Sequence, residues 1–218
     1  MNLTVITVAC ALLGEAPSAG YMYPPVVPAG VVTEVQLGGY EFTPDVEFFS
    51  PDPQVTITKT GPPGKLIVAP PPYWFGQKSM RAPFPIPREV PARVHVAEGN
   101  SAGSAYWQVA NAGGASRCVP FLVDAGNIVV ENRRRDTPQT LGTLPVIVAA
   151  RLGKIAEIDE YQFVATKDGF ITAELITHQI GSLLTGVIEV GETDGNRRLG
   201  DAVDLEGKDI ELTFAVTA

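Results

Sequence analysis

The sequence predicts an all-β protein made of two antiparallel β-sandwich domains. Glycine and proline are frequent, with 22 and 19 copies in 218 residues, and this composition favours short strands and turns over long helices. Apolar and polar residues alternate in many short runs, as they do in strands with one buried face. No stretch keeps a helical period for more than about two turns. The hydrophobic content of 45% is sufficient to build buried cores.

Residues 1–20 are predicted to be a signal peptide. Residues 3–13 are almost entirely apolar, and residues 14–20 include small residues of the kind that signal peptidases cleave. The apolar run is shorter than the roughly 20 residues that a membrane span needs. No Lys or Arg precedes it, so a first β-strand is the alternative interpretation. With cleavage, the protein is exported to the periplasm, the cell surface or the medium, and no membrane span remains.

Residues 21–124 are predicted to form a sandwich of immunoglobulin type. The strand at 31–37 alternates with period two and is expected to end at Gly38-Gly39. The other strands of this domain are expected at residues 46–49, 55–58, 65–68, 92–96, 105–110 and 117–123.

Residues 69–91 interrupt this series with a proline-rich segment. Proline cannot donate to a central β ladder, so the segment is predicted to be a loop or a sheet edge. Its residues Tyr73, Trp74 and Phe75 are candidates for an exposed aromatic platform that binds polysaccharide or protein. The alternative is that these aromatic side chains fold back and cap the first sandwich.

A second β series follows a polar linker at residues 125–143. The second domain, residues 144–218, is expected to be another β-sandwich. The Asp-Gly pair at residues 194–195 is a strong hairpin signal. The strands are expected at residues 145–150, 161–165, 170–176, 186–190 and 210–216.

Charge and motif spacing argue against several functions. The net charge of −8 argues against a nucleic-acid partner, because phosphate binding needs a concentrated basic face. Ser101 lies in a G-x-S-x-G match, but a strand follows it where the hydrolase motif requires a helix. We therefore expect a turn at Ser101 and no catalysis. His95 and His178 have no ligand neighbours at zinc-binding spacing. His95 is expected on the outer face of its strand.

Two further groups of side chains have alternative interpretations. Cys118 lies in an expected strand, and we expect the thiol to be buried rather than reactive. Residues 157–160 form an acidic cluster before a strand, whose carboxylates are candidate calcium ligands. The alternative for the cluster is a solvated turn.

Residues 144–216 resemble the bacterial pre-peptidase C-terminal (PPC) domain. The matching pieces include residues 144–148, the acidic-Tyr-x-Phe piece at 157–163 and residues 201–204. A second resemblance depends on residues 108–111, Gln-Val-Ala-Asn before a Gly-Gly turn. Residues 21–124 are similar to the immunoglobulin-like (TIG-type) module that precedes such domains in exported planctomycete-type proteins.

The resemblance to this family implies a jelly-roll-like, non-catalytic β-sandwich appended to secreted enzymes, with polysaccharide or protein ligands in some members and calcium in others. In this chain, Asp136, Glu157 and Asp159 occupy the positions of the family's calcium ligands, although arginines replace the upstream Pro-Asn. The family adds one more strand after residue 216, so the second sandwich is expected to be truncated here.

The expected function is that of a non-catalytic, exported binding or structural segment of a secreted or cell-surface protein. The alternative is an accessory fragment of a secreted peptidase or other hydrolase. No cofactor is expected to be required, and calcium is the one candidate ion. The expected partners are extracellular polysaccharide or protein.

Overall fold

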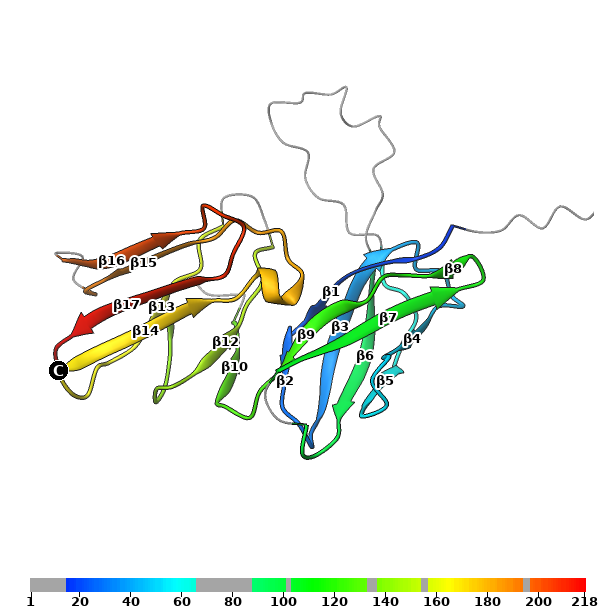
Figure 1. The fold of residues 1–218 in the computed structure, drawn as a ribbon, viewed down its shortest axis with the longest axis horizontal. Coiled ribbons are helices and arrows are strands. Elements are labelled where there is room, and N and C mark those ends of the chain that lie inside the picture. The colour runs from blue at the N-terminus through cyan, green and yellow to red at the C-terminus, as the bar shows by residue number, and fades with distance from the viewer. Residues whose placement is uncertain (1–14, 66–87, 101–102, 133–136, 154–156, 194–196) are drawn as a thin grey trace, which may run out of the picture.

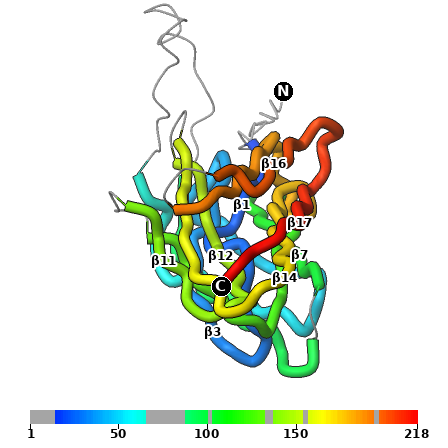
Figure 2. Tube along the Cα trace, turned by 90° about the vertical axis from the view of Figure 1, so that its left-hand side faces the viewer, coloured from blue at the N-terminus to red at the C-terminus, as the bar shows by residue number. Residues whose placement is uncertain are grey.

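The computed structural model describes residues 15–65, 88–100, 103–132, 137–153, 157–193 and 197–218. Within these residues the chain is all-β, as predicted. Its strands form two units that lie end to end, a first unit up to residue 124 and a second unit from residue 125 onward (Figure 1). Figure 2 views the molecule from the end of the second unit.

The first unit contains a four-stranded antiparallel sheet. Its strands are β1 (Ser18–Tyr23), β3 (Val32–Tyr40), β5 (Val55–Lys59) and β6 (Arg88–Val96). They are arranged in the order β1–β3–β6–β5. β3 and β6 are the longest strands of this sheet, and they form its centre.

A second sheet of five strands packs on the first. Its strands are β2 (Val26–Val27), β4 (Glu47–Phe49), β7 (Gly103–Asn111), β8 (Gly114–Ala115) and β9 (Val119–Val123). The order is β2–β9–β7–β4, with β8 also paired to β7. β2 runs parallel to β9, whereas the other pairs are antiparallel. The chain therefore begins in one sheet with β1 and crosses to the other with β2.

The core of the first unit lies between these two sheets. Buried side chains occupy alternate positions of the strands, because successive residues of a strand point to opposite faces. Trp107 on β7 is fully buried. The ring of Phe48 on β4 is tilted relative to the Trp107 ring, and the two ring centroids are 6.1 Å apart. The other large, fully buried side chains here are Val27, Leu37, Val46, Val90, Val94, Val96, Val109 and Phe121.

The outcome for individual residues of the first unit is mixed. His95 lies on the outer face of β6 between the fully buried Val94 and Val96, as predicted. The prediction for Cys118 was wrong, because its thiol is free and exposed. β9 begins one residue later and buries alternate positions starting at Val119, so Cys118 lies outside the buried series.

Several predicted boundaries also differ from the structure. The segment at 69–91 was expected to be a loop or a sheet edge, but its residues 88–91 belong to β6, a central strand of the first sheet. β3 was expected to end at Gly38 and Gly39, but it continues through both glycines to Tyr40. β1 begins at Ser18, so the last three residues of the expected signal peptide belong to a strand that pairs with β3. The expected strand at 65–68 lies almost wholly outside the described residues.

The second unit begins with two short parallel pairs. β10 (Ile128–Val130) pairs with β12 (Ile147–Ala149), and β11 (Gln139–Thr140) pairs with β13 (Tyr161–Gln162). The predicted linker at 125–143 therefore contains β10 and β11, and it is part of the second unit. Strands of two or three residues are too short to show the alternation from which strands are predicted.

Two antiparallel ribbons complete the second unit. β14 (Gly169–Leu175) pairs with β17 (Ile210–Val216), and β15 (Val187–Gly191) pairs with β16 (Arg198–Val203). The 3-10 helix η3 (His178–Ile180) follows β14. A Cβ added to Gly186 would lie 2.3 Å from the side chain of Leu175, so the ribbons pack closely at this position.

Burial differs strongly between the units. Among the described residues of the second unit, the buried hydrophobic side chains are Ala149, Ile210 and Phe214. The buried polar residues, Glu131, Thr177 and Asp204, all lie in the second unit as well. Polar contacts therefore have a larger share in holding the second unit together than in the first.

Candidate functional site at the junction of the units

The two units are joined by a short connection. In it, the N–H of Asp124 donates to the carbonyl of Val27 at 3.1 Å, and the N–H of Gly126 donates to the Asp124 carboxylate at 2.7 Å. The carbonyl of Asn127 then accepts the N–H of Ile147 at 2.8 Å. The connection is thus tied to the first unit at one end and to the second unit at the other.

A row of three residues on the first sheet forms one side of the junction. Tyr21 on β1 is the register partner of Gly38 on β3, which is in turn the partner of Glu89 on β6. A Cβ at Gly38 would lie 2.3 Å from the Tyr21 ring, so the ring passes over the glycine. The Tyr21 hydroxyl then donates to Oε1 of Glu89 at 2.5 Å. Glycine is required at residue 38 for this crossing because no side chain fits beneath the ring.

Arg151 of the second unit binds to this row. Its Nη1 donates to Glu89 Oε1 and also to the Tyr21 hydroxyl at 3.2 Å. Its guanidinium lies 5.6 Å from the Tyr21 ring centroid and 5.0 Å from that of Tyr23, which is cation–π geometry. Burial by itself lowers the pKa of Arg151, but the hydrogen bond and charge of Glu89 outweigh this effect and raise the pKa. The cation therefore links the units across their boundary.

A buried carboxylate positions the backbone of Arg151. Glu131, directly after β10, accepts the N–H of Arg151 on Oε2 at 3.0 Å, and its own N–H donates to the carbonyl of Ala149. These two bonds extend the β10–β12 pairing as far as Arg151. The side chain of Arg151 therefore leaves the second unit from a fixed backbone.

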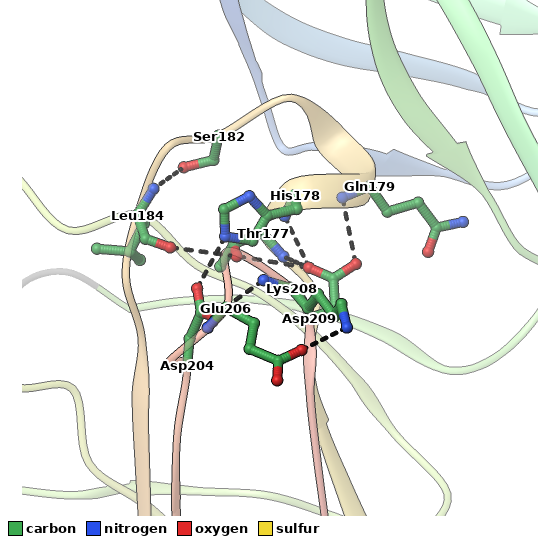
Figure 3. A network of polar contacts seen from close by, with 9 residues as sticks. All are labelled: Thr177, His178, Gln179, Ser182, Leu184, Asp204, Glu206, Lys208 and Asp209. Atoms are coloured by element: carbon green, nitrogen blue, oxygen red, sulfur yellow. Dashed lines mark hydrogen bonds and ion pairs between the residues drawn. The ribbon is translucent and has the colours of Figure 1, made fainter.

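The η3 segment forms a second contact between the units. Asp209 accepts three main-chain N–H groups there, from Thr177 at 2.6 Å, His178 at 2.7 Å and Gln179 at 3.2 Å (Figure 3). Ser182 closes the loop through its N–H to the carbonyl of Thr177 at 2.9 Å. A single carboxylate thus holds the first turn of η3 in place.

His178 and Asp204 add a side-chain pair to this segment. Nε2 of His178 lies 2.9 Å from Oδ2 of Asp204, and Oδ1 of Asp204 accepts the N–H groups of Glu206 and Lys208 (Figure 3). The N–H of Lys208 above all, together with His178 and the N–H of Glu206, lowers the pKa of Asp204 to about 2 despite its burial. Asp204 is therefore ionised at neutral pH and braces His178.

The η3 segment rests on the second sheet of the first unit. It lies against β9, where Gly181 approaches the ring of Pro120 so closely that an added Cβ would lie 3.2 Å away. Nε2 of Gln179 donates weakly to Oγ of Ser104 on β7 at 3.4 Å. The Arg151 contact and the η3 contact therefore reach the first unit on its two different sheets.

The His178–Asp204 pair has the geometry of a general base and its orienting acid. Catalysis of that type also needs a nucleophile within hydrogen-bonding distance of the histidine. In the part of the chain that the structure describes, the ring of His178 bonds to Asp204 alone, and the Ser182 hydroxyl accepts the N–H of Leu184 instead. In the described structure, Asp204 fixes the ring of His178 at the η3 segment.

Most sequence-predicted site residues lie outside the described residues. These are Tyr73, Trp74, Phe75 and Asp136, and Ser101, where a turn was expected, lies outside them as well.

Glu157 and Asp159 are described, in the segment that leads into β13. Glu157 accepts the N–H of Gly153, and Asp159 is half-buried. The described residues contain no group of three or more His, Cys, Asp or Glu placed to hold a metal ion.

The register of β11 and β13 bears on the calcium hypothesis. These strands are parallel, with Gln139 opposite Tyr161, and the N–H of Gln139 donates to the carbonyl of Glu160 at 2.9 Å. The segments that lead into the two strands therefore run side by side. One of them contains Asp159, and the other contains Thr137 and Pro138.

Sequence reasoning did not identify the junction residues. Arg151 directly follows one expected strand and Asp209 directly precedes another, and each became a functional candidate only through partners far away in the sequence. One signal was available at Gly38, because a glycine inside an alternating strand often marks a close approach of another group.

No protein-family model matches the chain, and no curated protein matches it. Among the described residues, no helix has the length and apolar character that a membrane crossing requires.

Proposed function

We propose that this chain is a non-catalytic, exported segment that holds two β modules in a fixed orientation and binds extracellular polymer. The junction carries the proposal, because the two units touch at two separate places. Glu89 and Arg151 form one contact, and Pro120 with the η3 segment forms the other. A tether of independent modules needs neither contact.

The strand order of the first unit supports an immunoglobulin-like module. The orders β1–β3–β6–β5 and β9–β7–β4 correspond to the ABED and GFC sheets of the seven-stranded immunoglobulin arrangement. For the second unit, the proposal rests on the resemblance of residues 144–216 to PPC domains. Such modules accompany secreted enzymes, so the parent protein we propose is a secreted or cell-surface protein, with a secreted hydrolase as one form of it.

Retention on insoluble polymers tests the binding role. The full chain is incubated with cellulose, chitin, peptidoglycan or collagen fibres, and the bound fraction is measured by sedimentation. We expect retention on one of these polymers that is lost in Trp74→Ala. Tyr106→Ala, which removes an exposed aromatic ring from β7, is the matched control and should retain binding. Retention that does not change in Trp74→Ala argues against the aromatic platform.

We also propose that calcium binds Asp136, Glu157 and Asp159, because the resemblance to PPC domains implies these residues and because Asp159 lies in the segment that leads into β13 beside β11. Calcium needs six to eight oxygen ligands, so carbonyls and waters would complete the set. Millimolar calcium should raise the melting temperature relative to chelator, because a ligand that binds only the folded state stabilises it. The shift should disappear in Asp159→Asn and persist in Glu174→Gln, a control on the exposed face of β14. Equal melting temperatures with calcium and with chelator contradict the site.

A further inference from the structure

The strand β14 has one edge without a neighbouring strand. Residues 169–175 pair with β17, and among the described residues the main chain of β14 bonds to no other strand. The β14–β17 ribbon runs from the C-terminus toward η3 (Figure 1). A strand with one free edge presents a row of N–H and C=O groups that can pair with another extended segment.

This edge lacks the features that usually block strand pairing. Free edges are commonly very short, bulged, or interrupted by proline or lysine. β14 is seven residues long, keeps an unbroken register with β17, and contains neither proline nor lysine. In contrast, the edge strand β4 has three residues, and the register of the edge strand β1 shifts between Ala19 and Tyr21. The edge of β14 is therefore open to the addition of a strand.

The apolar face of the ribbon continues up to this edge. Ile210 and Phe214 of β17 are buried. Their register partners on β14, Leu175 and Ile171, are only half-buried. Apolar surface thus remains uncovered beside the open edge. A segment added there would cover it with its own alternate side chains, since these point to one face of a strand.

The opposite face of the ribbon carries two carboxylates side by side. Glu174 and Glu211 are register partners, and both are exposed. In the part of the chain that the structure describes, neither carboxylate has a basic partner. Like charges directly opposite each other destabilise a strand pair, whereas opposite charges stabilise it. A lysine or arginine on a strand added beside β14 would lie next to Glu174 and supply the missing positive charge.

We propose that β14 binds an extended, basic peptide segment of a partner protein by strand addition. Apolar residues at alternate positions of the segment cover Ile171 and Leu175, and a basic residue on its other face pairs with Glu174. Main-chain hydrogen bonds supply the affinity, and these side chains select the sequence. The strand β14 of a second copy is a poor match, because it contains the same glutamate and no basic residue.

A synthetic peptide tests the proposal. The capped heptapeptide Val-Lys-Val-Thr-Val-Tyr-Val, paired antiparallel to β14, places its lysine opposite Glu174 and its valines on the apolar face. Its fluorescence anisotropy should rise with the concentration of the full chain and give a Kd below about 1 mM. Hydrogen–deuterium exchange should show new protection in residues 169–175. No binding up to that concentration, or binding without protection of β14, overturns the proposal.

Backbone methylation separates strand addition from general apolar binding. In an antiparallel pair, the N–H groups of alternate residues point to the same edge of a strand. N-methylation of one alternate set in the peptide should therefore abolish binding, and N-methylation of the other set should preserve it. Equal binding of the two methylated peptides contradicts pairing through the main chain.

A charge exchange tests the role of Glu174. Glu174→Lys should bind the lysine peptide about two- to fivefold more weakly and should prefer a peptide with glutamate in place of lysine. Glu47→Lys is the matched control, because Glu47 is exposed on the edge strand β4, and it should keep the original preference. Far-ultraviolet circular dichroism confirms that both variants are folded. An unchanged preference in Glu174→Lys overturns the assignment of a basic partner.

Self-association provides the remaining test. Protection of residues 169–175 that increases with the concentration of the chain alone, and that the peptide competes away, would identify a second copy as the occupant and overturn the proposal. None of these measurements involves Trp74 or polymer retention. Failure of this proposal and failure of the proposed function are therefore distinguishable.

Discussion

Gly38 shows how much a single residue contributes to the junction. Its missing side chain lets the Tyr21 ring cross β3 and reach Glu89, where Arg151 of the second unit also binds. The need for glycine here is spatial, since the residue continues an ordinary extended strand.

Gly38→Ala should therefore destabilise the protein by about 1–3 kcal/mol, the usual cost of forcing a group into packed surroundings. The new methyl group displaces the Tyr21 ring and breaks its hydrogen bond to Glu89. Urea unfolding measures the loss. Gly142→Ala is the control, because nothing lies within 4 Å of a Cβ at that position. A Gly38→Ala protein as stable as Gly142→Ala would mean that the ring moves without cost.

At the residue scale, the sequence predicts which face of a strand a side chain lies on better than it predicts the residue at which a strand begins or ends. His95 was placed correctly because alternation within β6 is uninterrupted. Cys118 was misplaced because it precedes the first residue of β9, and a sequence does not mark the first bonded residue of a strand. Gly38 was taken as a strand end because the neighbour that requires it, Tyr21, lies on another strand.

Among the elements, η3 shows how polar contacts replace a core. Asp209 binds its main-chain N–H groups and Asp204 binds His178, so two carboxylates position a helix of three residues. A short 3-10 helix has little stability of its own. Its place against β9 therefore depends on these two side chains.

The pH dependence of stability should reveal the Asp204 brace. The pKa of Asp204 is about 2 in the folded protein and near 4 in the unfolded chain. The ionised Asp204 carboxylate therefore contributes its full stabilisation of the folded state above about pH 4. This contribution is lost as the pH falls from about 4 through 2. Asp204→Asn lacks it at every pH, so the stabilities of the two proteins should converge toward pH 2. Urea unfolding followed by far-ultraviolet circular dichroism measures both curves.

Asp201→Asn provides the control for this pH series. Asp201 lies on the same ribbon with an exposed side chain, and its substitution removes only a surface ion pair with Arg198, so the stability should change little. A constant difference between Asp204→Asn and the unmodified protein from pH 7 to pH 2 would contradict the brace.

Longer strands could be predicted from the sequence, and short ones could not. β3, β7, β14 and β17 have at least seven residues and an alternating pattern. The parallel pairs of the second unit have two or three residues per strand, and only distant partners define them. For the same reason the segment that contains β10 and β11 was interpreted as a linker.

At the scale of the whole molecule, Arg151 determines how the units are held together. Arg151→Ala should cost about 1–3 kcal/mol, because it removes the charge-assisted hydrogen bond from Arg151 to Glu89 and the bond from Arg151 to Tyr21. It should also increase the radius of gyration measured by small-angle X-ray scattering as the units separate. Arg93→Ala removes an exposed ion pair with Glu34 at 2.7 Å and should change neither quantity measurably. An unchanged scattering curve for Arg151→Ala would show that the η3 contact alone suffices.

The presence of two β units could be predicted from composition and turn spacing, but their junction could not. Glu89 and Arg151 are 62 residues apart, and Gln179 and Ser104 are 75 residues apart. A single sequence contains no signal for contacts over such separations.

The placement of tryptophan gives the two units separate spectroscopic signatures. Both tryptophans of the chain belong to the first unit by sequence, and Trp107 is fully buried between its sheets. Its emission should therefore shift to longer wavelength when the first sandwich opens and should not respond when only the second unit unfolds. Emission and circular dichroism recorded on the same sample would then show whether the two units melt together or in sequence, without any label on the protein.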